Sequence, residues 1–211
     1  MTENSQKRAL LLIDVQNEYV SGALPIEYPP LEVSLPNIGR AIGIARAHGI
    51  PVVVVKQVAP ASSPIFAEGS HGAELLDVID QAEADLVVSK TLPSAFFGTN
   101  LKEWLVRNDL KTIVVAGYMS QNCVESTIRH AAHEGFAVEY LHDASGTVSF
   151  KNKLGSLSAR AMHEATSIVL QSRFAAVLTA DAWVDLVMHG VAAKRESIID
   201  SLNPMNIGSE A

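Results

Sequence analysis

The chain has 211 residues, of which 48% are hydrophobic and 18% are charged, as expected of a folded protein and not of a disordered one. Sixteen Lys and Arg against 23 Asp and Glu give a net charge of −7, and no basic block is present. This charge balance argues against a nucleic-acid or anionic-membrane partner. The single cysteine excludes an intrachain disulfide and a Cys-rich zinc site.

The length favours one domain that spans residues 1–211. The first apolar run, Ala9–Ile13, is too short for the core of a signal peptide. No other stretch approaches the roughly twenty apolar residues of a membrane span. We therefore predict a cytoplasmic protein.

Six apolar runs have the length of strands, and most are rich in β-branched residues without alternation. This pattern is typical of parallel strands that are covered on both faces. The predicted strands are Ala9–Ile13, Pro51–Val55, Leu86–Val88, Thr112–Ala116, Ala137–Leu141 and Ala175–Leu178. The predicted helices between and after them are Leu35–His48, Ala73–Ala82, Leu101–Asn108, Cys123–Glu134, Leu157–Gln171 and an amphipathic stretch from Asp181 to Ser201. This alternation predicts an α/β fold, a three-layer α/β/α sandwich around a mostly parallel, six-stranded, Rossmann-like sheet.

Two segments, residues 21–36 and 59–72, are predicted to be long loops, which often cover active sites. Functional residues of parallel sheets gather beyond the carboxyl ends of the strands. Asp14, Gln57, Lys90 and the loop Gly117–Cys123 follow four of the predicted strands in this way.

An acid, a base and a thiol at one sheet edge are the groups needed for nucleophilic catalysis. Burial of Asp14 would raise the pKa of its carboxyl group toward that of a general base. A position near the start of a helix, with Lys90 nearby, would favour the thiolate of Cys123. The alternatives are a turn or helix-capping role for Asp14, a solvated surface position for Lys90 and an inert buried thiol for Cys123.

Three sequence blocks carry a family resemblance. Leu11–Gln16 (LLIDVQ) resembles the opening of the isochorismatase-like cysteine hydrolases, and Lys90–Leu101 (KTLPSAFFGTNL) resembles their Lys-x-x-x-Ser-Ala-Phe segment. Gly117–Val124 (GYMSQNCV) matches their Gly-x-x-Thr-x-x-Cys-Val nucleophile loop, with Ser120 in the usual Thr place. The resemblance extends to the Asp143-Ala144 turn and covers most of the chain.

The resemblance implies a catalytic triad of Asp14, Lys90 and Cys123. Cys123 would attack an electrophilic carbon, Asp14 would accept the thiol proton and later activate water, and Lys90 would orient and stabilise charge. Members of the family cleave small amides, ureido compounds and lactams, or the enol ether of isochorismate. The resemblance also implies a cis peptide bond between Tyr118 and Met119, which turns the Met119 N–H toward the Cys123 N–H to form an oxyanion hole.

A metal site is not expected. The metal-dependent nicotinamidases of this superfamily carry an Asp-x-His ligand set after the second strand, whereas Val54–Val58 contains no such set, so we disfavour nicotinamidase activity. His130 and His133 lie three residues apart, not the four of a zinc-protease helix. Neither a phosphate-binding glycine loop nor a dinucleotide fingerprint occurs, so we predict no cofactor.

Five side chains are candidates for binding a small-molecule substrate: Tyr19, Gln57, Phe66, Phe96 and Tyr118. For the aromatic residues the alternative is a place in the core, and for Gln57 it is loop capping. The presence of Cys123 favours hydrolysis of a C–N bond over hydrolysis of an enol ether.

Other functions stay open at this point. They are hydrolysis of an enol ether, a catalytically silent binding or assembly protein, and a thiol redox enzyme. The redox enzyme is disfavoured because the chain has no second cysteine to resolve a sulfenic acid. The family resemblance further implies a homo-oligomer, either a dimer or a tetramer.

Overall fold

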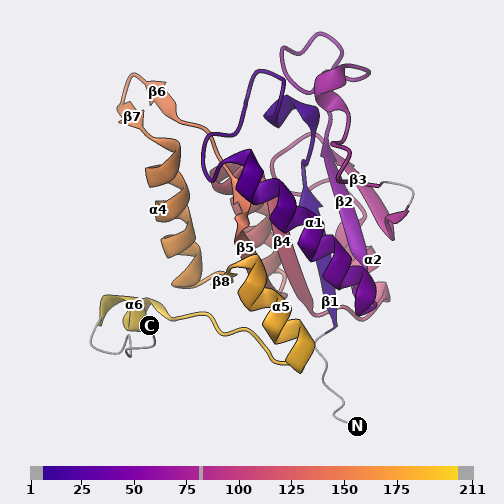
Figure 1. Ribbon diagram of the computed structural model, residues 1–211, viewed down its shortest axis with the longest axis vertical. Helices are drawn as coiled ribbons and strands as arrows, with labels where there is room; N and C mark the ends of the chain where they lie inside the picture. Colours follow the sequence, from indigo (N-terminus) through magenta and orange to yellow (C-terminus); the bar gives the residue numbers. More distant parts are fainter. Residues whose placement is uncertain (1–6, 81–82, 204–211) are drawn as a thin grey trace.

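The computed structural model describes residues 7–80 and 83–203. Its centre is a parallel six-stranded sheet with the order β3-β2-β1-β4-β5-β8 (Figure 1). The strands are β1 (Arg8–Ile13), β2 (Val52–Gln57), β3 (Leu86–Lys90), β4 (Thr112–Tyr118), β5 (Ala137–Gly146) and β8 (Ala176–Leu178). Every predicted strand overlaps an observed one, and the predicted fold class is confirmed.

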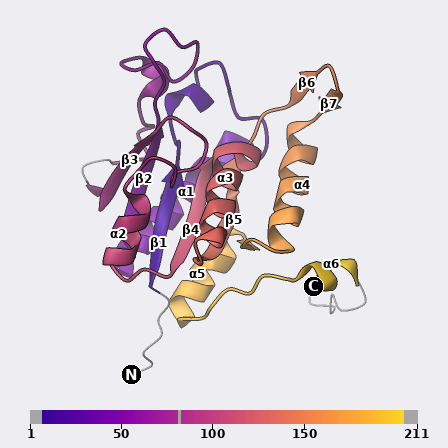
Figure 2. The same ribbon diagram turned by 180° about the vertical axis from the view of Figure 1, so that it is seen from behind.

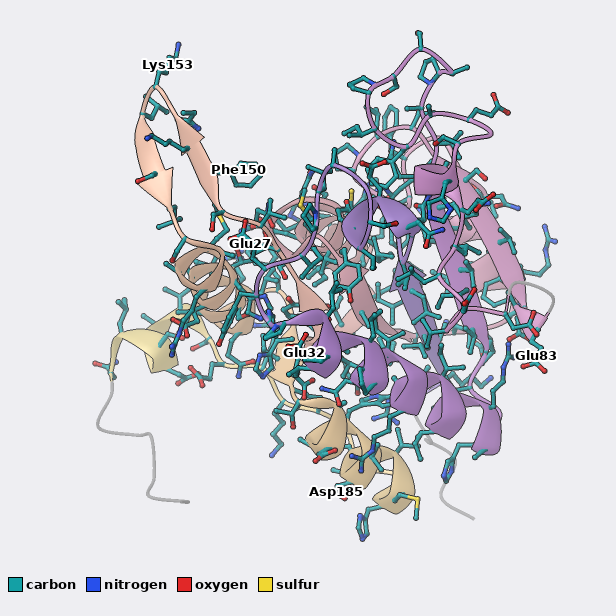
Figure 3. All side chains as sticks on the ribbon, turned by 45° about the horizontal axis from the view of Figure 1, so that its top comes forward. Glu27, Glu32, Glu83, Phe150, Lys153 and Asp185 are labelled. Atoms are coloured by element: carbon teal, nitrogen blue, oxygen red, sulfur yellow. The ribbon has the colours of Figure 1, made fainter. Side chains whose placement is uncertain are left out.

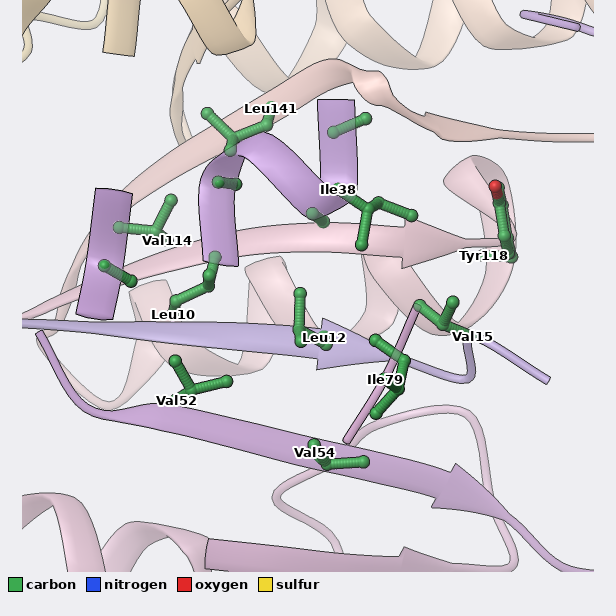
Figure 4. Close-up of a cluster of buried hydrophobic side chains, with 14 of the residues drawn as sticks. Leu10, Leu12, Val15, Ile38, Val52, Val54, Ile79, Val114, Tyr118 and Leu141 are labelled. Carbon is green, nitrogen blue, oxygen red and sulfur yellow. The ribbon is translucent and has the colours of Figure 1, made fainter. Parts of the chain in front are cut away.

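Helices cover both faces of the sheet. The helices α1 (Leu31–Ala47) and α5 (Ala180–His189) cover one face (Figure 1), and α2 (Leu101–Arg107), α3 (Glu125–His133) and α4 (Ala159–Gln171) lie on the other side (Figure 2). Successive residues of β1 therefore enter different cores. Leu10 and Leu12 pack toward Ile38 of α1 (Figure 4) and share a core with residues of α5, whereas Leu11 and Ile13 pack toward α2 and α3. This two-sided burial explains why the strands are apolar at every position.

A buried ion pair joins the two halves of the sheet. Arg8 Nε on β1 lies 2.9 Å from Glu139 Oε2 on β5, and both side chains are almost fully buried. The Trp183 Nε1–H on α5 donates to the same carboxylate at 2.8 Å. The charge of Glu139 is therefore matched by a cation and a further donor, as a buried carboxylate requires.

The predicted helix over Ala73–Ala82 is wrong for the residues that the structure describes. Its start is a short 3-10 turn, η2 (His71–Ala73), and no α-helix follows before the gap at residues 81–82. Several backbone groups of this segment bond to the loop after β1 and not in a helical pattern. The Leu76 N–H donates to Val15 O at 3.0 Å, and Ala73 O accepts from Gln16 Nε2 at 2.8 Å. Tertiary hydrogen bonds thus override the helical periodicity of the sequence.

Two boundaries also differ from the predictions. Helix α1 begins at Leu31, inside the segment predicted as a loop over residues 21–36, and contains Pro36. Pro36 lies in the second turn, where it removes only one helical hydrogen bond. The C-terminal stretch is two helices and not one, because α5 ends at Gly190 (φ 64°) and α6 (Ile198–Leu202) begins only after a non-helical segment.

The sequence analysis missed a β-hairpin formed by β6 (Phe150–Asn152) and β7 (Gly155–Leu157). All six strand residues are exposed, and the hairpin extends away from the sheet with Lys153 at its tip (Figure 3). The following helix α4 begins two residues later than predicted, after its N-cap Ser158, whose side chain accepts from the Ala161 N–H. None of the helices within residues 7–80 and 83–203 combines the length and the apolar character of a membrane span.

Candidate active site

The candidate site lies where the strand order of the sheet reverses. From β1 the chain goes outward to β2 and β3, then returns to β4 on the other side of β1 and continues to β5 and β8. Loops after neighbouring strands diverge at such a point and leave space for a ligand. Asp14 follows β1 directly, and Cys123 lies five residues beyond the end of β4.

The structure brings Asp14, Lys90 and Cys123 together. Lys90 Nζ lies 2.7 Å from Asp14 Oδ2 and 3.2 Å from Cys123 Sγ. The Asp14 and Lys90 side chains are fully buried, and Cys123 is 5% exposed. Three chemically active groups that are 33 to 109 residues apart in the chain therefore form one buried cluster.

Two glutamine side chains hold this cluster in place. Lys90 Nζ also donates to Gln57 Oε1 at 2.7 Å, because Gln57 and Lys90 are register partners at the ends of β2 and β3. The backbone of Gln57 is held in turn by Gln16, whose Oε1 accepts from the Gln57 N–H at 2.8 Å and whose Nε2 donates to Gln57 O at 3.0 Å. The structure thus places Gln57 against Lys90.

The electrostatics of the cluster differ from the prediction for the thiol. Burial, followed by the nearby charge of Asp14, raises the pKa of Cys123 to about 12, and Lys90 only partly opposes this shift. Lys90 favours the thiolate, as expected, but desolvation outweighs its effect, so the thiol is protonated at rest. Burial also raises the pKa of Asp14, against the opposing effect of Lys90. The resting site combines a protonated thiol with a carboxyl group whose proton affinity is raised.

Residues 119–124, which we call the nucleophile turn, carry Cys123. The Tyr118–Met119 peptide bond before it is cis, as predicted. The turn is a π-helical turn over Ser120–Val124, and α3 starts only at Glu125, two residues later than the predicted helix. Among the described residues, the Met119 N–H has no hydrogen-bond acceptor. Cys123 thus lies just before a helix, in a turn with a free backbone donor.

Gly117 explains how the end of β4 lies so close to Asp14. It pairs with Ile13 in the sheet and has a φ of 113°, a conformation that L side chains rarely adopt. A Cβ atom at this position would lie 2.1 Å from the carbonyl oxygen of Ile13. Only glycine fits here, and the ends of β1 and β4 can therefore approach each other.

Comparison with known proteins identifies the family. The family model described as the isochorismatase domain matches residues 8–190, which include the whole cluster. The chain belongs to the isochorismatase family. A crystal structure from Burkholderia xenovorans LB400, of a protein named provisionally as an isochorismatase, is 52% identical and has a TM-score of 0.92, over 94% of this chain and 96% of that one.

Two sequence relatives show how varied the isochorismatase family is. The secreted isochorismatase effector Isc1 of Verticillium dahliae is 39% identical over 69% of this chain and 75% of its own length. Nicotinamidase 3 of Arabidopsis thaliana is 32% identical over 84% of this chain and 87% of its own length. The family is one of hydrolases that includes amidases. Because one relative is named as secreted, the cytoplasmic location of this chain stays a prediction.

Three predicted substrate residues of this family member form an aromatic group beside the cluster. The ring of Tyr19 lies 5.3 Å from that of Phe66 and 5.5 Å from that of Tyr118. Tyr118 Oη is bonded to Ser34 Oγ on α1 at 2.8 Å, whereas the Tyr19 hydroxyl has no hydrogen-bond partner among the described residues. The charges of Asp14 and Cys123 contribute to raising the pKa of Tyr19, after burial, which indicates that its hydroxyl is near both. Tyr19 is thus the best placed of the three.

Phe96, the remaining aromatic candidate, packs on the helical layer. Its ring stacks on His130 of α3 at 5.1 Å and lies 5.9 Å from that of Phe136. Its role in substrate binding stays a prediction. His130 is itself bonded to Ser94 Oγ at 2.9 Å, so a packing role accounts for it. In residues 7–80 and 83–203, no group of three or more His, Cys, Asp or Glu side chains is arranged to hold a metal ion.

The sequence analysis missed Glu18, which connects the loops near the site. Its buried carboxylate accepts from the Ala23 N–H at 2.6 Å and from the Phe66 N–H at 3.3 Å. Gly22 and Gly72 both pack against it so closely that a Cβ at either position would clash with its carboxylate. Gly22 and Gly72, both in predicted loops, could have indicated a close approach of another group to the backbone. That this group is Glu18 in both cases is visible only in the fold.

Proposed function

We propose that this chain is a cofactor-free cysteine hydrolase that cleaves the C–N bond of a small amide, ureide or lactam through an acyl intermediate on Cys123. The observation that carries the proposal is the buried contact of Lys90 Nζ with both Asp14 Oδ2 and Cys123 Sγ. A surface lysine or an inert thiol would not need such a contact. The membership in a hydrolase family that includes amidases supports the same reaction class.

The first half-reaction follows from the protonation states of the site. Because the thiol is protonated at rest, its proton must leave as Cys123 Sγ bonds to the substrate carbonyl carbon. Asp14 is the acceptor, since its Oδ1 is buried without a hydrogen-bond partner among the described residues and its pKa is raised. The C–N bond then breaks, and the amine leaves with the proton that Asp14 returns.

The second half-reaction regenerates the enzyme. Water attacks the thioester carbon, Asp14 takes a proton from that water, and the C–S bond breaks. The acid product leaves, and the sulfur recovers the proton. Lys90 stays beside both groups and stabilises negative charge on Asp14 and on the sulfur. In both steps the N–H groups of Met119 and Cys123 hold the negative charge that develops on the substrate oxygen.

Substrate binding is assigned to the residues around this centre. Tyr19, with its unpaired hydroxyl, is proposed to donate to the substrate, and Phe66 and Tyr118 to form an apolar wall beside it. Gln57 is connected to the triad by the hydrogen bond that its Oε1 accepts from Lys90 Nζ. Phe96 stays a candidate for an apolar contact with the substrate.

The test is turnover of a panel of small amides and ureides, followed by ammonia release. The wild type should release ammonia from at least one compound, and hydroxylamine should intercept the thioester as a hydroxamate. Cys123→Ala should abolish both signals while its circular dichroism stays that of the wild type. Turnover of an amide or ureide that persists in Cys123→Ala would refute the covalent mechanism.

We further propose that the chain acts as one domain and forms a homo-oligomer. Several apolar side chains are exposed on α5, on α6 and between them: Met188, Val191, Ile198, Ile199 and Leu202. Such a group of exposed apolar residues is typical of an interface. Light scattering coupled to size exclusion measures the assembly directly, and a monomer at micromolar concentration would contradict the proposal.

A further inference from the structure

The nucleophile turn has a buried partner outside the triad. Ser120, the first residue of the π-helical turn, is fully buried. Its Oγ lies 2.8 Å from Nδ1 of His163 on α4. The two residues are 43 positions apart in the chain, and the bond links the turn that carries Cys123 to a helix that contributes no group of the triad.

His163 is an unusual residue for its environment. Its ring is 2% exposed and lies between the rings of Tyr28, at 5.6 Å, and His142, at 6.0 Å. Burial lowers its pKa to about 4, so the ring is neutral near pH 7. Its Nε2 has no hydrogen-bond partner in the described part of the chain. An apolar side chain of similar size would avoid that desolvation cost, so packing alone does not account for a histidine here.

In the described part of the chain, few side-chain hydrogen bonds hold the turn from outside. No side chain caps its first residue. Besides the bond to His163, its side chains are held from outside by the bond of Lys90 Nζ to Cys123 Sγ at 3.2 Å and by the bond of Thr147 Oγ1 to Gln121 Oε1 at 2.5 Å. Ser120 directly follows Met119, the donor assigned to the oxyanion hole, and precedes Cys123 by three residues. A shift of Ser120 therefore moves both groups.

We propose that His163 is a positioning residue that holds the nucleophile turn through Ser120, so that the Met119 N–H and the Cys123 thiol keep the geometry needed for attack. This inference rests on the proposed function of Cys123. It concerns orientation and not binding, since the contacts of the His163 side chain within residues 7–80 and 83–203 are with Tyr28, His142 and Ser120, which are neither triad nor predicted substrate residues. Small displacements of reacting groups have large effects on rate.

The experiment compares two pairs of variants. His163→Leu keeps an apolar body without a hydrogen bond, whereas His163→Asn keeps an oxygen near the position of Nδ1. Ser120→Ala removes the hydroxyl, whereas Ser120→Thr keeps it. Ser167→Ala is the matched control, because Ser167 lies one turn later on α4 and its Oγ donates to the backbone oxygen of His163.

In the amide assay, His163→Leu and Ser120→Ala should each lower kcat by about 10- to 100-fold without changing KM. His163→Asn and Ser120→Thr should recover much of that loss, and Ser167→Ala should behave as the wild type. The double variant His163→Leu/Ser120→Ala should lose no more than the more affected single variant, because both changes remove the same bond. The melting temperature of His163→Leu should not fall in proportion to kcat.

Alkylation of Cys123 by iodoacetamide separates this inference from the proposed function. If no amide is turned over but alkylation changes in His163→Leu and not in Ser167→Ala, the positioning role stands and the proposed reaction fails. If amides are turned over and His163→Leu keeps the wild-type kcat and alkylation rate, the positioning role is refuted. Losses in kcat that add in the double variant would refute it as well.

Discussion

Replacing Lys90 by Met tests the central ion pair of the site through stability as well as activity. The Asp14 and Lys90 side chains are both 0% exposed and form an ion pair at 2.7 Å. Methionine keeps most of the length of lysine but leaves the Asp14 carboxylate buried without its cation. Breaking a buried pair on one side costs about 3–5 kcal/mol of unfolding free energy. That is a large part of the total stability of a domain, about 5–15 kcal/mol.

This cost should depend on pH in a defined direction. Burial raises the pKa of Asp14 above its ordinary value of 3.8, and Lys90 opposes that shift. Without Lys90 the folded-state pKa rises further. A carboxyl group whose pKa is raised in the folded state stabilises the fold most at pH values below its unfolded-state pKa. That contribution is lost as the pH rises through the folded-state pKa. The deficit of Lys90→Met should therefore be largest near neutral pH and shrink on acidification.

Urea unfolding of the wild type and of Lys90→Met, near pH 7 and near pH 5, measures the loss of unfolding free energy at each pH. The double variant Asp14→Asn/Lys90→Met is the matched control, because it removes both charges and should regain much of the lost stability. All of these variants should lack turnover. Wild-type stability of Lys90→Met near pH 7, or a deficit that neither acidification nor Asp14→Asn reduces, would refute the reasoning.

Three further predictions concern the surroundings of the triad. Tyr19→Phe should lower kcat/KM roughly threefold to tenfold, the worth of one neutral hydrogen bond, while thermal unfolding stays unchanged; an unaltered kcat/KM would remove Tyr19 from the substrate contacts. Gly72→Ala would place a Cβ atom 2.2 Å from Glu18 Oε2. We therefore expect a lower melting temperature, and a raised KM because the loop that carries Phe66 shifts. Wild-type values of both quantities would contradict this. Dialysis against a strong chelator should change neither activity nor melting temperature; zinc or iron that is present stoichiometrically and lost together with activity would overturn the interpretation of residues 54–58.

The sequence by itself determined the sheet and the members of the cluster. Each strand is apolar at nearly every position because both of its faces are covered, so the runs can be recognised without knowledge of their neighbours. Asp14 and Lys90 stand at the ends of such runs, and Cys123 follows a third after a short loop. Parallel strands place their carboxyl ends at one edge, which is why these three residues could be predicted to meet.

Only the tertiary structure decided the properties that depend on partners far apart in the chain. The periodicity of Ala73–Ala82 favours a helix, but hydrogen bonds to Val15 and Gln16 engage the Leu76 N–H and the Ala73 carbonyl oxygen. The position of Cys123 favours a thiolate, but burial keeps the thiol protonated, and burial is a property of the whole fold. The link from His163 to Ser120 has no local signal either. Local patterns record which backbone and side-chain groups a segment has, whereas the energies of those groups depend on the desolvation and the contacts that folding imposes.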